Sequence, residues 1–277
     1  MIINPVSLSF PERKIKQILR NIIFKKGRLK CPRCNCFKIL SIRNEDRYFC
    51  KRCRKKFSIL SNTRMRNIKI PLSAFIILLY LWLEDASVDL TKKLTGLSRP
   101  TIYSYFRLFR RNIVKTIEFK PRDNVQVDEA YFGRIKKQAN RLHNWNTYKT
   151  PIKVCVAGIA CPQTGQLATR VIESRPGKPI KTFIREYVPN DITVYSDGSP
   201  IYTELKKTHW HVPKTHDLGF HDAYYIESCW SWMKRKLFKQ YHHFSKKYAK
   251  EYVSELTFKF NTRKIEKNPF YYISKSL

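Results

Sequence analysis

The pattern of apolar and polar residues changes its type part-way along the chain. Between residues 72 and 117 it predicts three helices: an almost wholly apolar Leu72–Leu83, a short Val88–Leu94, and a third that begins after Ser98 and runs to about Thr116. From Asp123 onward, alternating and continuous apolar runs predict strands instead. The apolar helix is too short for a bilayer, which needs about 20 residues, so we expect it to be buried.

The C-terminal half predicts the order βββ-α-β-α-β-α, which is typical of a mixed α/β layer. The expected strands cover residues 125–132, 154–160, 167–173, 192–196 and 210–212, and the expected helical segments cover 179–187, 200–206, 225–237 and 247–261. Residues 1–30 predict a lead-in helix. The apolar pattern therefore places a small module, residues 31–60, between that helix and the helical region.

Two CxxC pairs lie in this small module. Cys31 and Cys34 form the first, Cys50 and Cys53 the second, and fifteen residues separate the pairs. This spacing predicts a zinc ribbon, in which four thiolates close a tetrahedral shell and the zinc is structural. Unpaired thiols in a small core are the alternative, and Cys36 could compete as a ligand. The scattered remaining cysteines indicate a reducing compartment rather than a disulfide framework.

The charge of the chain is strongly unbalanced. Lys and Arg number 55 against 21 Asp and Glu, which gives a net charge of +34. Such a protein repels itself unless it meets a polyanion, so nucleic acid is the expected partner and an anionic membrane surface the alternative. Met1–Phe10 lacks the pattern of a signal peptide, so we expect an intracellular protein, in a nucleus or in a bacterial nucleoid or cytoplasm.

The three predicted helices have the pattern of a helix-turn-helix domain, which we place at residues 68–120. The turn is Thr95–Ser98, and the third helix has an apolar face. Its other face is expected to be exposed to DNA and carries Arg99, Thr101, Ser104, Arg107, Arg110 and Arg111. A plain three-helix bundle with a solvated basic face is the alternative.

Carboxylates are scarce, and three of them lie within or at the ends of predicted strands and helices. Asp128 lies within a strand, Asp197 ends another, and Glu227 begins a helix that carries Lys234 two turns later. Carboxylates at neighbouring strand ends can hold two Mg²⁺ ions for phosphodiester chemistry. Glu129 should point to the opposite sheet face from Asp128, so only one of the two can be a ligand. Each residue has an alternative explanation: Asp128 could pair with an Arg, Asp197 could belong to an ordinary turn, and Glu227 could be a surface residue of its helix.

These residues resemble a known family, the DDE transposases of the ISXO2-like (IS1595) group and their eukaryotic relatives, the Merlin elements. The segments that carry the resemblance are the ribbon Cys31–Cys53, Val127–Gly133, Tyr195–Gly198, Ile226–Lys236 and Tyr241–Arg263. The resemblance implies an RNase H-like catalytic core over residues 121–277, Mg²⁺ or Mn²⁺ as two catalytic ions, and Asp128, Asp197 and Glu227 as the triad. Many members have Asn where this chain has Tyr224, and Asp222 is a nearby alternative ligand.

The sequence thus predicts a transposase that binds terminal inverted repeats, cleaves at them and joins the freed 3′-hydroxyl to target DNA. Lys234 is expected to contact a phosphate near the cut, and His242 and His243 to contact DNA phosphate or cap a helix, with metal binding as their alternative. Since two ends must meet, at least a homodimer is expected on DNA. The alternatives are an RNase H-like nuclease without strand transfer, a domesticated, catalytically inactive DNA-binding regulator, and an unrelated transcription factor.

Overall fold

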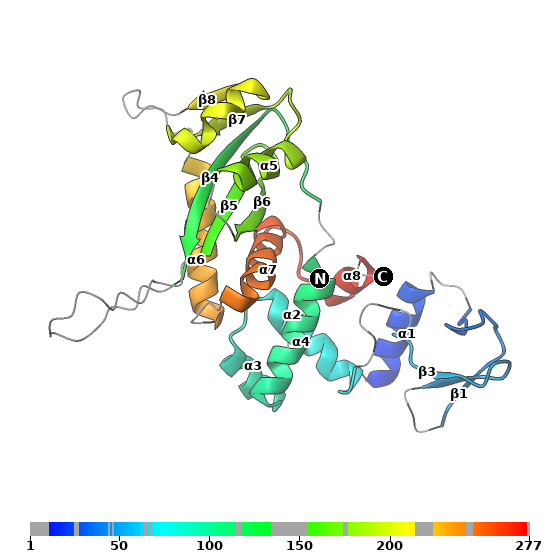
Figure 1. The fold of residues 1–277 in the computed structure, drawn as a ribbon. Coiled ribbons are helices and arrows are strands. Elements are labelled where there is room, and N and C mark those ends of the chain that lie inside the picture. The colour runs from blue at the N-terminus through cyan, green and yellow to red at the C-terminus, as the bar shows by residue number, and fades with distance from the viewer. Residues whose placement is uncertain are drawn as a thin grey trace. The chain divides into compact units, whose positions relative to one another are not determined.

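The chain folds as two units, one made of residues 1–116 and 266–277 and the other of residues 117–265. The structure is a computed structural model (Figure 1) and describes residues 11–24, 28–43, 45, 47–61, 63, 66, 68–114, 118–133, 154–173, 177–213, 224–241 and 246–275. Every described helix is too short or too polar to cross a membrane.

The helices of the first unit pack around α2 (Leu72–Leu83), which contacts α1 (Glu12–Ile23), α3 (Val88–Thr95), α4 (Arg99–Asn112) and α8 (Pro269–Lys275). Phe75 and Trp82 of α2 are wholly buried and pack on the ring of Phe109, with centroids 5.5 and 5.7 Å away. Burying each such side chain stabilises the unit by about 1.5–3 kcal/mol. The apolar helix is therefore buried, as its sequence predicts.

Side-chain caps fix the boundaries between α3 and α4. Ser87 Oγ accepts a hydrogen bond from the Leu90 N–H, and Ser98 Oγ accepts one from the Thr101 N–H. Gly96 ends α3 with φ of 69°, a left-handed conformation that glycine adopts without a Cβ clash. The predicted turn at Thr95–Ser98 is confirmed, and Pro100 lies in the first turn of α4.

The zinc-ribbon module contains a three-stranded antiparallel sheet in the order β1 (Ile39–Ser41), β2 (Tyr48–Cys50), β3 (Lys56–Phe57). Tyr48 pairs with Phe57 across β2 and β3, and their rings lie 5.7 Å apart. Both rings pack toward the side of the sheet that holds the cysteines.

The second unit contains a five-stranded mixed sheet in the order β6-β5-β4-β7-β8. Its strands are β4 (Asn124–Phe132), β5 (Val154–Cys161), β6 (Gln166–Ile172), β7 (Thr193–Ser196) and β8 (His211–Pro213). β4, β5 and β6 pair antiparallel, whereas β4, β7 and β8 pair parallel. The mixed α/β architecture expected from the sequence is confirmed.

Helices cover both faces of this sheet. α5 (Lys178–Tyr187) and the 3₁₀ segment η3 (Pro200–Lys207) share a buried cluster with one face, which includes Val125 and Val127 of β4. α6 (Tyr224–Tyr241) contacts β4 and β5, and α7 (Ala249–Asn261) contacts β6. The short η5 (Lys246–Tyr248) precedes α7. Alternate residues of β4 therefore face different helices.

Two features differ from the sequence-based expectations. The catalytic domain was expected to continue to residue 277, but residues 266–277, including α8, belong to the first unit. Arg110 was expected on the exposed face of α4 but is 6% exposed. Arg110 lies four residues after Phe106 and three before Ile113, both buried, so its long side chain is covered at the apolar face of the helix.

Candidate active site and metal centre

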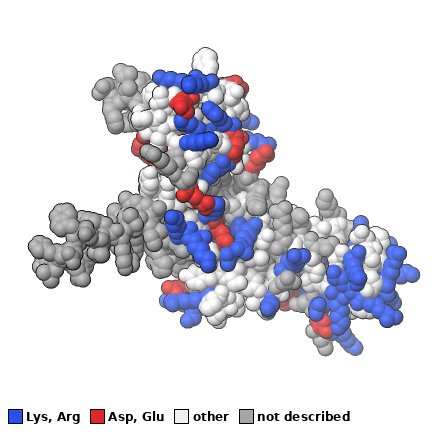
Figure 2. All heavy atoms as spheres, viewed as in Figure 1, with Lys and Arg blue, Asp and Glu red and all other residues white. Residues whose placement is uncertain are grey.

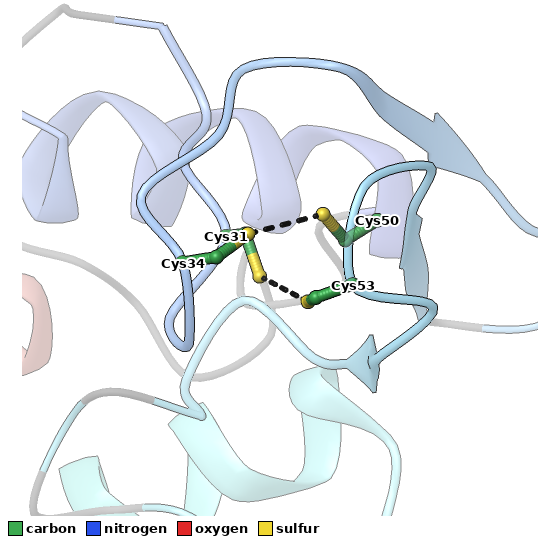
Figure 3. Close-up of side chains that lie close together, drawn as sticks. All are labelled: Cys31, Cys34, Cys50 and Cys53. Atoms are coloured by element: carbon green, nitrogen blue, oxygen red, sulfur yellow. Dashed lines mark hydrogen bonds between the residues drawn. The ribbon is translucent and has the colours of Figure 1, made fainter.

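Four cysteine thiols form the metal centre of the ribbon (Figure 3). The Sγ atoms of Cys31 and Cys53 lie 3.5 Å apart, as do those of Cys34 and Cys50, and all four atoms lie within 4.8 Å of one another. Ligands of a tetrahedral zinc, with Zn–S bonds of about 2.3 Å, are separated by about 3.8 Å. The donor set and its size therefore fit a structural zinc.

Backbone amides support the thiolates. The Arg33 N–H points to Cys31 Sγ at 3.4 Å. The N–H groups of Cys53 and Arg52 lower the pKa of the Cys50 thiol, which favours the thiolate that binds metal, whereas burial and the neighbouring thiols raise the pKa of Cys34 to about 12. Cys36, the alternative ligand, does not belong to the group of four, and its Sγ accepts a hydrogen bond from the Lys38 N–H.

Asp128 lies within β4, and Asp197 directly follows β7, which pairs parallel with β4. β4 pairs with β7 so that Val125 lies beside Val194 and Gln126 beside Tyr195. The same register, if continued two residues past the last paired residues, would place Asp128 beside Asp197. The charge of Asp197 contributes to raising the pKa of Asp128, which agrees with this alignment. Asp197 is exposed, and its Oδ1 accepts a hydrogen bond from the Ser199 N–H.

Trp230 of α6 holds the Asp128 carboxylate. The indole Nε1–H donates to Asp128 Oδ2 at 2.9 Å, and the ring is almost fully buried. Gly158 of β5 pairs directly with Asp128, and a Cβ at this glycine would lie 2.5 Å from the Trp230 ring. The glycine therefore leaves the space in which the indole reaches across the sheet to the carboxylate.

Burial is the main cause of a raised pKa at Asp128, which reaches about 6. The charges of Glu129 and Asp197 also raise it, while the Trp230 bond lowers it. The rise corresponds to a folding cost of about 3 kcal/mol above pH 6, which disappears as falling pH protonates the carboxyl. A bound cation would offset this cost, so the Asp128 and Asp197 oxygens fit a hard divalent ion.

Glu129 lies on the opposite face of the sheet, as the strand period predicts. Its carboxylate accepts a hydrogen bond from the hydroxyl of Tyr202 in η3, and burial together with Glu129 raises the pKa of that hydroxyl. Tyr202 belongs to the core cluster that includes residues of α5. Glu129 therefore has a partner in the core and faces away from α6.

Glu227 lies on the exposed side of the first turn of α6, three residues before Trp230. In the part of the chain that the structure describes, the four cysteines are the one group of three or more such side chains close enough to hold a metal. Among the described residues, Asp197 is thus near enough to Asp128 to affect its pKa, but no group of three carboxylates with Glu227 is formed. Lys234 is exposed, and its Nζ lies 5.8 Å from the centre of the Phe132 ring, at the end of β4.

Comparison with protein-family models adds a decisive observation. The model of the ISXO2-like transposase domain matches residues 122–261, half of the chain, and includes Asp128, Asp197 and Glu227. The chain belongs to the ISXO2-like transposase family. The model of the transposase zinc-ribbon domain matches residues 11–56, which include all four cysteines of the metal centre. Comparison with curated proteins gives no match.

Arg263, two residues beyond the matched domain, and Gln126 of β4 anchor the start of α6. Arg263 Nη1 donates to the Gly165 carbonyl in the β5–β6 turn at 2.9 Å, and its Nη2 donates to the Tyr225 hydroxyl at 3.1 Å. Gln126 of β4 accepts from the Ile226 N–H at 3.0 Å. These bonds fix the two residues before Glu227. Arg263 belongs to the segment Tyr241–Arg263 that carries the resemblance, but the sequence did not predict this role for it.

A buried ion pair in the ISXO2-like domain holds α6 against α7. Lys259 Nζ and Glu255 Oε1 of α7 lie 2.7 Å apart with almost no exposure. The Tyr241 hydroxyl of α6 donates to the same carboxylate, and Lys259 donates to Gln240 Oε1 of α6 at 2.9 Å. Because buried charges are stable only when their polar groups are satisfied, this network favours one register of α6 on α7.

The other residues expected to bind DNA differ in how exposed they are to solvent. Arg99, Ser104 and Arg111 are exposed and Thr101 and Arg107 are half-buried on α4, whereas Arg110 is buried. Arg99 is paired with Asp89 of α3 at 2.6 Å. His242, His243 and Asp222 lie outside the described residues. Tyr224 is 66% exposed at the start of α6.

Replacing Trp230 with Phe should raise the pKa of Asp128 by about one pH unit, because a hydrogen bond to a charged acceptor is worth about 1.5–3 kcal/mol. In the wild type this bond stabilises the ionised carboxyl of Asp128, so removing the bond favours the protonated form. Carboxyl NMR titration of the metal-free transposase measures this. Trp232→Phe is the matched control, because Trp232 packs on Phe260 instead. An unchanged Asp128 titration in Trp230→Phe would show that the indole does not control the carboxylate.

Proposed function

We propose that this chain is a DNA transposase that binds terminal inverted repeats and catalyses metal-dependent strand cleavage and strand transfer. The observation that carries the proposal is that Asp197 directly follows β7, which pairs parallel with the strand of Asp128, while Trp230 of α6, the helix with Glu227 in its first turn, bonds the Asp128 carboxylate. Family membership and the +34 charge support a DNA substrate. The mixed sheet supports an RNase H-like core.

Asp128, Asp197 and Glu227 would hold Mg²⁺ or Mn²⁺ as two ions. The ions, when bound, would activate the attacking oxygen and stabilise the leaving oxygen. The first attack is by water on the phosphodiester at the element end and breaks the bond to the 3′ oxygen. The freed 3′-hydroxyl then attacks a phosphodiester of target DNA, so that one bond forms for each that breaks. Glu227 would approach the two Asp residues when DNA is bound.

Positive residues would hold the DNA backbone. On α4 these are Arg99, Arg107 and Arg111, beside Thr101 and Ser104, in a helix-turn-helix arrangement. Lys234 is seven residues beyond Glu227, about 10 Å along α6, which suits a phosphate beside the cut. His242 and His243 would also contact DNA phosphate. Bringing two element ends together requires at least a dimer on DNA.

The test is incubation of a labelled duplex from the sequence flanking the coding region with the protein and Mg²⁺. Wild type should produce cleaved and joined strands, and Asp197→Ala should produce neither while still binding the duplex. Cleavage without joined product would instead identify a nuclease. Binding without cleavage by either protein would identify a DNA-binding regulator, and Tyr224 would be the first position to restore to Asn.

A further inference from the structure

Lys and Arg side chains gather over the zinc-ribbon module (Figure 2). Between Arg28 and Phe57 the sequence has eleven Lys and Arg residues against two acidic residues, Glu45 and Asp46. Every one of these eleven is exposed. The density of charge is therefore far above what solvation of a small module needs.

A groove of about 540 Å³ lies beside the ribbon sheet. Arg47, Lys55 and Lys56 contribute basic side chains to its lining, together with Arg66 from the segment that follows the ribbon. Ser58 and Ser61 add hydroxyls, and Ile70 and Leu72 add apolar surface from the segment leading into α2. The groove thus combines several cations with a partly apolar lining.

The register of the ribbon sheet explains why Arg47, Lys56 and Ser58 share a face. Phe49 pairs with Lys56, and Tyr48 pairs with Phe57, so the two pairs lie on opposite faces. Tyr48 and Phe57 take the face that packs with the cysteines. Continuing the pairing places Arg47 beside Ser58 on the face of Lys56. The zinc-bearing face is therefore closed, and the other face carries Arg47 and Lys56, whereas Lys55 joins the groove lining from the residue before β3.

We propose that this groove binds the sugar–phosphate backbone of one DNA strand, with the cations on phosphate oxygens and the apolar lining against deoxyribose. This deepens the proposed function, because it assigns part of the DNA contact to a defined surface of the ribbon. Backbone contacts position a protein on DNA without reading its sequence. The groove would therefore fix the register of the ribbon on DNA, and base recognition would come from elsewhere.

The test measures the salt dependence of binding to a short duplex of arbitrary sequence, with the full-length protein and no Mg²⁺. A triple variant, Arg47→Gln with Lys55→Gln and Lys56→Gln, should lower the slope of log affinity against log salt by about 2–3, since each phosphate contact contributes about 0.9. Replacing Lys38, Lys51 and Arg52 with Gln is the matched control, because these exposed residues lie in the same ribbon but not in the groove. The control should change the slope by less than half as much.

An uncharged substitution that fills the groove distinguishes DNA binding in the groove from a general effect of positive charge. Ser58→Trp would fill it without changing any charge and should weaken binding at least tenfold, while zinc content and melting temperature remain as in wild type. Equal slopes for the triple variant and its control, or full affinity in the plugged protein, would overturn the groove while leaving the transposase proposal intact. Absence of DNA binding by the wild type would overturn the proposed function itself.

Discussion

Asp128→Asn is expected to lower the rate of metal-dependent DNA cleavage by about 1,000-fold or more. A charged metal ligand supplies several kcal/mol of transition-state stabilisation, and each 1.36 kcal/mol is a factor of ten in rate. The same variant should be more stable than wild type at pH 7, because it removes a carboxylate whose raised pKa shows that its burial is costly. Cleavage assays and thermal melting measure the two effects.

Glu129→Gln is the matched control on the next residue of β4. Gln can still accept the hydrogen bond from Tyr202, so the core contact is retained while the charge is lost. This variant should keep most of the cleavage activity. If instead Glu129→Gln were inactive and Asp128→Asn active, the catalytic ions would lie on the face of the sheet covered by η3. Loss of activity together with loss of stability in Asp128→Asn would indicate a structural role for Asp128.

The position of the candidate site could be predicted from the sequence because it depends on local patterns. Alternation along β4 places Asp128 and Glu129 on different faces, and the short apolar run of β7 ends directly before Asp197. The ribbon was equally predictable, because the spacing of its cysteines reflects the geometry of one ion. The expected metal-ligand set of four cysteines is confirmed as a spatial group.

The features that could not be predicted from the sequence depend on contacts between residues far apart in the chain. The bond from Trp230 to Asp128 joins residues 102 positions apart, and the space for it is provided by Gly158 on a third element. A tryptophan at a buried helical position and a glycine within a strand each have an ordinary packing explanation. Only their meeting at a carboxylate indicates a functional role. In the same way, α8 follows the transposase domain in sequence but packs on α1 and α2.

Removing zinc is expected to unfold the ribbon. Its buried cluster consists of Leu29, Cys31, Cys50 and Phe57, so two of its four members are zinc ligands. A module with so small a core depends on its metal, and structural zinc contributes about 10–16 kcal/mol to folding in isolated fingers at pH 7. A chelator, or Cys50→Ser, should therefore release one zinc and abolish the dispersed NMR signals of residues in β1, β2 and β3.

Cys36→Ser controls for the loss of a thiol and should retain one zinc with an unchanged ribbon spectrum, since Cys36 is not among the four clustered thiols. If Cys36→Ser lost the metal and Cys34→Ser kept it, Cys36 would be the ligand in place of Cys34.

A ribbon that kept its signals in chelator would show that strand pairing alone stabilises the module. With the expected result, DNA binding through the ribbon groove should also fail in chelator, because Arg47 and Lys56 of the groove are positioned by the sheet that zinc holds together. Chelation in the absence of Mg²⁺ therefore separates the contribution of zinc to DNA binding from that of the catalytic ions to cleavage.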